Sequence, residues 1–344
     1  MNKQQYIFFL ILLTSFLNGD RLLQAQRYSA EDFSLSKSKT DTKTVPVKSQ
    51  DVAKSDTEFI RLTKDSTGAP EALQTSITRY RGKNGLLVDL IGVIHIGERD
   101  YYQKLNKQFD QYESMLYELV APPGSRVPDR HSAKKGGNPI HWLQGTMQRM
   151  LGLESQLQHV DYTKSNFVHA DLSPQEMQAK LAERGETVWS VGMKAINEMM
   201  NKQSEMSKNG EAAFGQDIEN MDDLFGMLSN PQQLKLTLAK QFASGGALEA
   251  GLGGTLNQIL IQDRNQAAMK VLESEIQKGN KKLALFYGAA HMPDFEKRLI
   301  NDLGMRKTKH AWVDAWDLQS APEKASPVTG IADMLFQLMD SIDQ

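Results

Sequence analysis

LLVDLIGVIHIGERDYYQKLNKQFDQYESMLYELV, residues 86–120, is the segment around which the rest of the fold is predicted. Residues 86–94 are apolar except for Asp89, which is typical of a parallel strand covered on both faces. Apolar residues then recur at helical spacing, and residues 115–120 form a second short apolar run. The stretch therefore predicts a strand, a helix and a second strand, which together make one βαβ unit.

A second unit of the same design lies near the C-terminus. Residues 282–287 have the composition of a buried strand, and the motif GAAH follows them at 288–291. A helix is expected after Pro293, and residues 311–316 should form the next strand. The chain is thus expected to carry two strand-GxxH-helix units.

The segments around these units predict the rest of the architecture. Asn84-Gly85 between two strand-like runs predicts an antiparallel hairpin at the start of the sheet. Ser173 and Glu176 form a capping box, and helical patterns continue to about residue 278. We therefore expect an α/β fold with a mixed central sheet and a large helical insertion, at about residues 172–278, between the two units.

The ends of the chain differ from this central domain. Residues 1–25 have the polar start, short apolar run and small-residue end of a signal peptide, and residues 26–56 have the composition of a disordered linker. The domain should span residues 57–317, and residues 318–344 should form a linker and a C-terminal amphipathic helix. The protein is expected to be exported, to the periplasm or outside the cell. The alternative is a protein anchored in the membrane by an uncleaved signal segment.

Composition narrows the choice of partners. The net charge is -2, with 40 Lys and Arg residues against 42 Asp and Glu residues, so the balance does not favour nucleic acid as a partner. The chain has no cysteine, which excludes disulfides and thiolate chemistry. Peripheral membrane association through the N-terminal segment or the C-terminal helix stays open.

Two histidines occur in the same local motif. His95 ends GVIH and His291 ends GAAH, each directly after a predicted strand, with Gly92 and Gly288 three residues earlier. Ligands of open α/β sheets gather at the carboxyl ends of the strands, and Glu118 lies near a third such end. Either histidine alone is expected to be structural, but two imidazoles and a carboxylate form a candidate site for a divalent metal. Glu118 could be a ligand or the general base.

Arg264 is a further candidate because its position in the predicted helix, residues 255–277, points it inward. A buried arginine needs an anionic partner, so a structural ion pair competes with stabilisation of charge on a substrate. Asp263 and Asn265 should face other directions. Asp171 precedes the capping box, where it could start the helix or support the metal ligands.

The order GVIH, then YEL with Glu118, then QDRN with Arg264, then GAAH resembles the TraB/PrgY/GumN family, whose animal relatives are the TIKI proteases. The resemblance runs from about residue 59 to 316. It implies an α/β sheet with a helical insertion, related to erythromycin-esterase-like and ChaN-like folds. It also implies His95 and His291 as metal-site residues, completed by Glu118 and Arg264.

The activity implied by the resemblance is metal-dependent hydrolysis of a peptide or related bond, with Mn²⁺ or Co²⁺ as the metal and Zn²⁺ as an alternative. The leading hypothesis is therefore an exported metallopeptidase or related hydrolase acting on a peptide or small molecule. The alternative is a non-catalytic protein that sequesters a peptide or a haem-like ligand in the same pocket. The loops after His95 and Glu118 match no motif of the family and leave the substrate open.

Overall fold

The computed structural model describes residues 57–122, 151–187, 230–243 and 257–320, together with Gln148, Ser190 and Lys194. The expected signal peptide, the linker at 26–56, most of the C-terminal segment at 318–344 and parts of the insertion lie outside the described residues. No helix within the described part of the chain is both long and apolar enough to cross a membrane.

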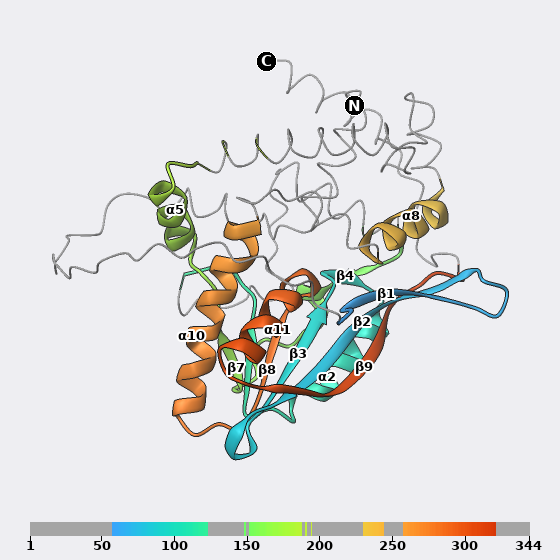
Figure 1. Cartoon of the computed structure of the whole chain (residues 1–344). Coiled ribbons are helices and arrows are strands. Elements are labelled where there is room, and N and C mark those ends of the chain that lie inside the picture. Colours follow the sequence, from blue (N-terminus) through green and yellow to red (C-terminus); the bar gives the residue numbers. More distant parts are fainter. Residues whose placement is uncertain are drawn as a thin grey trace.

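The described residues form an α/β domain around a seven-stranded mixed sheet (Figure 1). Its strands are β1 (Ile60–Lys64), β2 (Pro70–Arg81), β3 (Leu87–Val93), β5 (Ser114–Tyr117), β7 (Phe167–His169), β8 (Lys282–Gly288) and β9 (Arg306–Asp317). Two short strands, β4 (Ile96–Gly97) and β6 (Glu154–Ser155), pair separately. The helices are α2 (Arg99–Phe109), α4 (Gln156–His159), α5 (Pro174–Glu183), α8 (Pro231–Ala243), α10 (Asp263–Gln277) and α11 (Met292–Asn301). The predicted fold class is confirmed.

The sheet has an antiparallel part and a parallel part. Strand β2 pairs antiparallel with β9 along one edge and with β1 and β3 along the other. Beyond β3 come β8, β5 and β7, and all three pairings are parallel. The predicted hairpin between β2 and β3 is confirmed, and a turn at Lys83–Gly85 closes it with Asn84 in the left-handed region at φ 54°.

Helices cover both faces of the parallel part, α2 on one face and α10 and α11 on the other (Figure 1). Strand β8 has apolar side chains on both faces of the sheet, so both faces are covered by helices. Its Leu283, Leu285 and Tyr287 belong to the core with α10 and α11, while Ala284 and Phe286 belong to the core with α2. This alternation follows from the two-residue period of a strand, and it buries β8 completely after Lys282.

The second unit departs from its expected form at β9. The strand begins at Arg306, five residues before the expected start at 311, and its pairing partner is β2. The chain thus crosses from β8 over α11 to the far edge of the sheet, and β2 and β3 lie between β8 and β9. Residues 306–310, RKTKH, lack the apolar pattern of a strand because they lie on an exposed edge, where charge discourages pairing with other chains.

The described parts of the expected insertion are helical. Helix α5 has the predicted capping box, with Ser173 accepting from the Glu176 backbone and the Glu176 side chain accepting from the Ser173 backbone. A π-helical turn at Gln258–Gln262 leads directly into α10. Such turns are rare and are often found at functional sites, and this one lies just before Arg264.

Candidate functional site

Four neighbouring parallel strands bring the candidate residues to one edge of the sheet. His95 follows β3, His291 follows β8, Glu118 follows β5 and Asp171 follows β7. Because β8 inserts between β3 and β5, its histidine arrives between the two residues contributed by the first unit. The carboxyl ends of parallel strands are where α/β folds bind ligands.

Gly288 lies at the point where these side chains converge. A methyl group on Gly288 would lie 3.3 Å from Glu118 Oε2, 3.5 Å from His95 Nε2 and 3.7 Å from His291 Cδ2. The three candidate residues therefore surround one small volume, and the missing side chain of Gly288 leaves it open. Gly92, at the equivalent position of the first motif, instead accommodates Ala289 and Met292, which pack against β3.

His95 is held through both its side chain and its backbone. Its Nδ1 lies 2.8 Å from Gln156 Oε1, and its carbonyl accepts from the Gln156 backbone N–H at 2.8 Å. The carbonyls on either side are also held, Ile94 O by the Tyr102 hydroxyl at 2.9 Å and Ile96 O by Trp316 Nε1 at 2.7 Å. Three successive backbone carbonyls are thus held where the chain leaves β3. This fixes the backbone position from which the His95 side chain projects.

His291 lies in a buried helical turn and is held by Asn265. Its Nδ1 lies 2.6 Å from Asn265 Oδ1, and Asn265 Nδ2 donates to the His291 carbonyl at 3.0 Å and to Asp294 Oδ2 at 2.8 Å. The expectation that Asn265 faces away from the site is wrong, because Asn265 is fully buried against His291. Asn265 and Arg264 are adjacent on α10, and both point into the site.

An ion-pair chain joins the ends of β5 and β7 through Arg264. Arg264 donates to Asp171 through Nε at 3.0 Å and Nη2 at 2.6 Å, and Nη2 also donates to Glu118 Oε1 at 2.6 Å. The other carboxylate oxygen, Oε2, accepts from the Gly288 backbone N–H at 2.7 Å. The inward direction predicted for Arg264 is confirmed, and Asp171 contacts the site through Arg264.

These contacts decide the charge states. Burial alone would raise the pKa of Glu118, but the Arg264 guanidinium holds that pKa well below its ordinary value. Burial alone would lower the pKa of Arg264, but Asp171 and Glu118 raise it above its ordinary value. Glu118 is therefore an anion and Arg264 a cation at every physiological pH.

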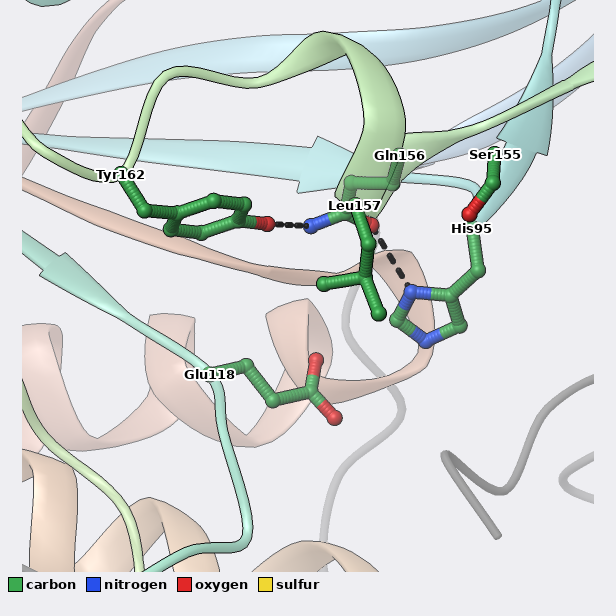
Figure 2. Close-up of a pocket in the computed structure, with 6 residues that line it drawn as sticks. All are labelled: His95, Glu118, Ser155, Gln156, Leu157 and Tyr162. Carbon is green, nitrogen blue, oxygen red and sulfur yellow. Dashed lines mark hydrogen bonds between the residues drawn. The ribbon is translucent and has the colours of Figure 1, made fainter. Parts of the chain in front are cut away.

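A small pocket opens beside His95 and Glu118. It has a volume of about 20 Å³, enough for one water molecule, and Ser155, Gln156, Leu157 and Tyr162 complete its wall. Figure 2 shows the Glu118 carboxylate and the His95 ring on facing sides of this space, with Gln156 bridging His95 and Tyr162. The segment that carries β6 and α4 thus contributes one whole side of the site.

Three further histidines make structural contacts. His169 Nε2 lies 2.6 Å from the Leu119 carbonyl, His159 Nε2 lies 3.2 Å from Glu154 Oε2, and His310 Nδ1 lies 2.8 Å from the Thr78 hydroxyl. His169 and the Leu119 carbonyl join the ends of β7 and β5, which helps to place Asp171 and Glu118.

The donor set fits a first-row divalent metal. His291 Nε2 and Glu118 Oε1 are 3.6 Å apart, close to the roughly 3.4 Å between two ligands bound tetrahedrally at about 2.1 Å. Both Nδ1 atoms are engaged by side-chain amides, the arrangement that directs Nε2 toward a metal. Among the described residues, no group of three or more His, Asp or Glu side chains is arranged so that it could hold a metal ion as it stands.

Comparisons with known proteins add no relative. The chain matches no protein-family model, no curated protein and no solved structure. The likeness to the TraB/PrgY/GumN family therefore rests on the motifs themselves.

Proposed function

We propose that this protein is a metal-dependent hydrolase, with a peptide or a related small molecule as substrate. The observation that carries the proposal is the meeting of His95, His291 and Glu118 around Gly288, at the carboxyl ends of three adjacent strands. Two imidazole nitrogens and one carboxylate leave coordination positions open for water and substrate, as catalytic metal sites require.

The two histidines would hold the metal through Nε2, with Mn²⁺ or Co²⁺ as the leading candidates and Zn²⁺ as the alternative. A bound divalent ion supplies an acidified water and polarises a substrate carbonyl. The protein orients both imidazoles in advance, because Gln156 and Asn265 already occupy the opposite ring nitrogens.

Glu118 suits the role of ligand better than that of general base. Its carboxylate accepts from the Arg264 guanidinium and from the Gly288 N–H, and both contacts favour the charged form. A carboxylate held in this way accepts a proton poorly, whereas each of its oxygens still has a lone pair for a metal. We therefore assign Glu118 as the third ligand.

The Arg264 guanidinium would bind Glu118 and would make no direct contact with the substrate. Three of its five N–H groups point at Asp171 and Glu118, and Nη1 lies 3.4 Å from the Leu260 carbonyl. With so few donors left over, its contribution is to keep Glu118 ionised and fixed. Asp171, whose side chain is fully buried, balances the charge of the guanidinium.

Hydrolysis is tested by incubating the purified protein with a defined mixture of peptides in ¹⁸O-labelled water, with Mn²⁺, Co²⁺ or Zn²⁺ added. The expected products are peptides with new C-termini that carry one ¹⁸O atom. These products should not form when EDTA is added, or with the His95→Ala and His291→Ala variants. Arg99→Met is the matched control, since Arg99 forms an exposed pair with Glu154.

A different result would identify the alternative function. Peptides that bind tightly and are recovered intact with every metal would contradict hydrolysis and favour sequestration in the same pocket.

Export is proposed from the sequence of residues 1–25 alone. Fractionation of producing cells followed by N-terminal sequencing is expected to give a mature form that begins near Gln26. A chain that keeps its N-terminus and stays with the membrane would favour the anchored alternative.

A further inference from the structure

Gln156 contacts His95 through both its backbone and its side chain. Its backbone N–H donates to the His95 carbonyl, and its side-chain oxygen lies 2.8 Å from His95 Nδ1. The antiparallel pair of β4 and β6 forms the base of this contact, since Ile96 pairs with Ser155 directly beside it. Gln156 is itself buried, with 5% of its surface exposed, so its position is fixed relative to the imidazole.

Tyr162 contacts the other end of the Gln156 amide. Gln156 Nε2 donates to the Tyr162 hydroxyl at 2.7 Å, and Oε1 faces His95 Nδ1. The Tyr162 ring packs against Tyr117 and Phe167, with ring centroids 5.3 Å and 5.6 Å apart. Because Tyr117 directly precedes Glu118, the ring that contacts the Gln156 amide also packs against the strand that supplies the carboxylate.

The second histidine provides an independent example of the same arrangement. Asn265 Nδ2 faces two acceptors, the His291 carbonyl and the Asp294 carboxylate, so Asn265 Oδ1 must face His291 Nδ1. An amide oxygen can only accept, so His291 Nδ1 carries the proton, and in the neutral imidazole Nε2 then presents a lone pair on the side of Glu118.

We propose that Gln156 is a positioning residue that holds His95 in the tautomer with the proton on Nδ1. His95 Nε2, which would lie 3.5 Å from a methyl group on Gly288, then carries a lone pair that faces the space shared with Glu118 and His291. Gln156 and Asn265 thus make the two histidines equivalent, although one amide comes from α4 and the other from α10. The inference deepens the proposed function and rests on it only for the effect on metal affinity.

The tautomer is measured in the metal-free protein by long-range ¹H–¹⁵N NMR of the imidazoles, at a pH of about 8, where an ordinary histidine is neutral. We expect His95 and His291 both to show a protonated Nδ1 and an unprotonated Nε2. Gln156→Leu is expected to shift His95 toward protonation on Nε2 and to leave His291 unchanged. Gln158→Leu, at an exposed position of the same helix, is the matched control and should change neither.

Gln156→Glu supplies a rescue. A carboxylate can accept from His95 Nδ1 as the amide oxygen does, and the Tyr162 hydroxyl can donate to it. This variant should therefore keep the wild-type tautomer, and it keeps the test decisive if Gln156→Leu fails to fold. A protonated Nε2 on His95 in the wild type, or an unchanged His95 tautomer in folded Gln156→Leu, would overturn the proposal.

Metal affinity gives the second measurement. Titration with Mn²⁺ or Co²⁺ should show an affinity loss of about 10- to 100-fold in Gln156→Leu and near wild-type affinity in Gln156→Glu and Gln158→Leu. If the wild-type tautomer is as expected and no metal binds, the metal proposal fails and the assignment of Gln156 stands. If metal binds as tightly to Gln156→Leu as to the wild type, the assignment of Gln156 fails.

Discussion

The two GxxH units share one motif and differ in how the protein holds the histidine. His291 is buried in a helical turn, and its partner Asn265 is buried against two acceptors. His95 is half-buried at a pocket wall, and its partner Gln156 contacts the Tyr162 hydroxyl, which can either donate or accept. We call these the closed half and the open half of the site.

The difference shows how one motif can be adapted to two tasks. The closed half joins the core through Asn265 and the Arg264 ion pairs, so changes there should cost stability. The open half borders the pocket, so substitutions there should alter the His95 tautomer and ligand binding while the protein still folds.

The largest effect is expected from Arg264→Met in the closed half. The substitution leaves Glu118 and Asp171 as buried carboxylates without their cation, and we expect a loss of about 3–5 kcal/mol in the free energy of unfolding. Urea unfolding followed by circular dichroism measures it. Arg99→Met, which breaks an exposed pair, should cost about 0–1 kcal/mol. Equal losses in the two variants would remove the distinction between buried and exposed pairs on which the closed half rests.

A smaller effect is expected from exchanging each amide for a carboxylate. Asn265→Asp places an acceptor against the His291 carbonyl and the Asp294 carboxylate, and should cost about 1–3 kcal/mol. Gln156→Glu should cost less, because the Tyr162 hydroxyl can donate to the new carboxylate. The two variants are compared by urea unfolding at neutral pH in EDTA. A greater loss for Gln156→Glu would reverse the assignment of the two halves.

Substitutions at Gly92 and Gly288 should separate effects on core packing from effects on metal binding. A methyl group at Gly92 would lie 3.3 Å from the Ala289 side chain, which has no rotamer that avoids it, so Gly92→Ala should lower stability by about 1–3 kcal/mol through overpacking. A methyl group at Gly288 would enter the space between Glu118 and His95, so Gly288→Ala should weaken metal binding more than Gly92→Ala does. Thermal unfolding and metal titration of both variants test this, and the reverse order in metal binding would contradict it.

The smallest effect is a pH dependence confined to the closed half. The pKa of Glu118 is lower in the folded protein than in the unfolded chain, so its stabilisation is present at neutral pH and is lost as the pH falls through the folded pKa. The gap in unfolding free energy between wild type and Glu118→Gln should therefore narrow as the pH falls from 7 to about 3, measured in EDTA. The cost of Gln156→Leu should change less over the same range, because neither residue can ionise at this position. A constant gap for Glu118→Gln would show that Arg264 does not hold the carboxylate as described.

Local patterns in the sequence were enough to predict the strands that end at His95, Glu118 and His291. A buried strand has a continuous apolar run, and a polar residue at its end stands out. The inward direction of Arg264 also followed from helical spacing. These features depend on residues close to one another along the chain.

The features that sequence reasoning missed depend on contacts between distant segments. No local pattern shows that β8 inserts between β3 and β5, which is what places His291 beside the other two residues. Gln156 lies 61 residues after His95, and no spacing rule connects them. One signal could have identified Asn265, because an amide buried beside a buried arginine needs hydrogen-bond partners. The helix face expected for Arg264 instead placed Asn265 away from the site.

The proposed function requires that His95, His291 and Glu118 hold one divalent metal. Isothermal titration of the metal-free protein with Mn²⁺ or Co²⁺ tests it most directly, with His95→Ala, His291→Ala and Gln158→Leu titrated in parallel. We expect one site per chain, a loss of affinity in each histidine variant and wild-type affinity in Gln158→Leu. Wild-type affinity in both folded histidine variants, or no binding to the folded wild-type protein, would contradict it.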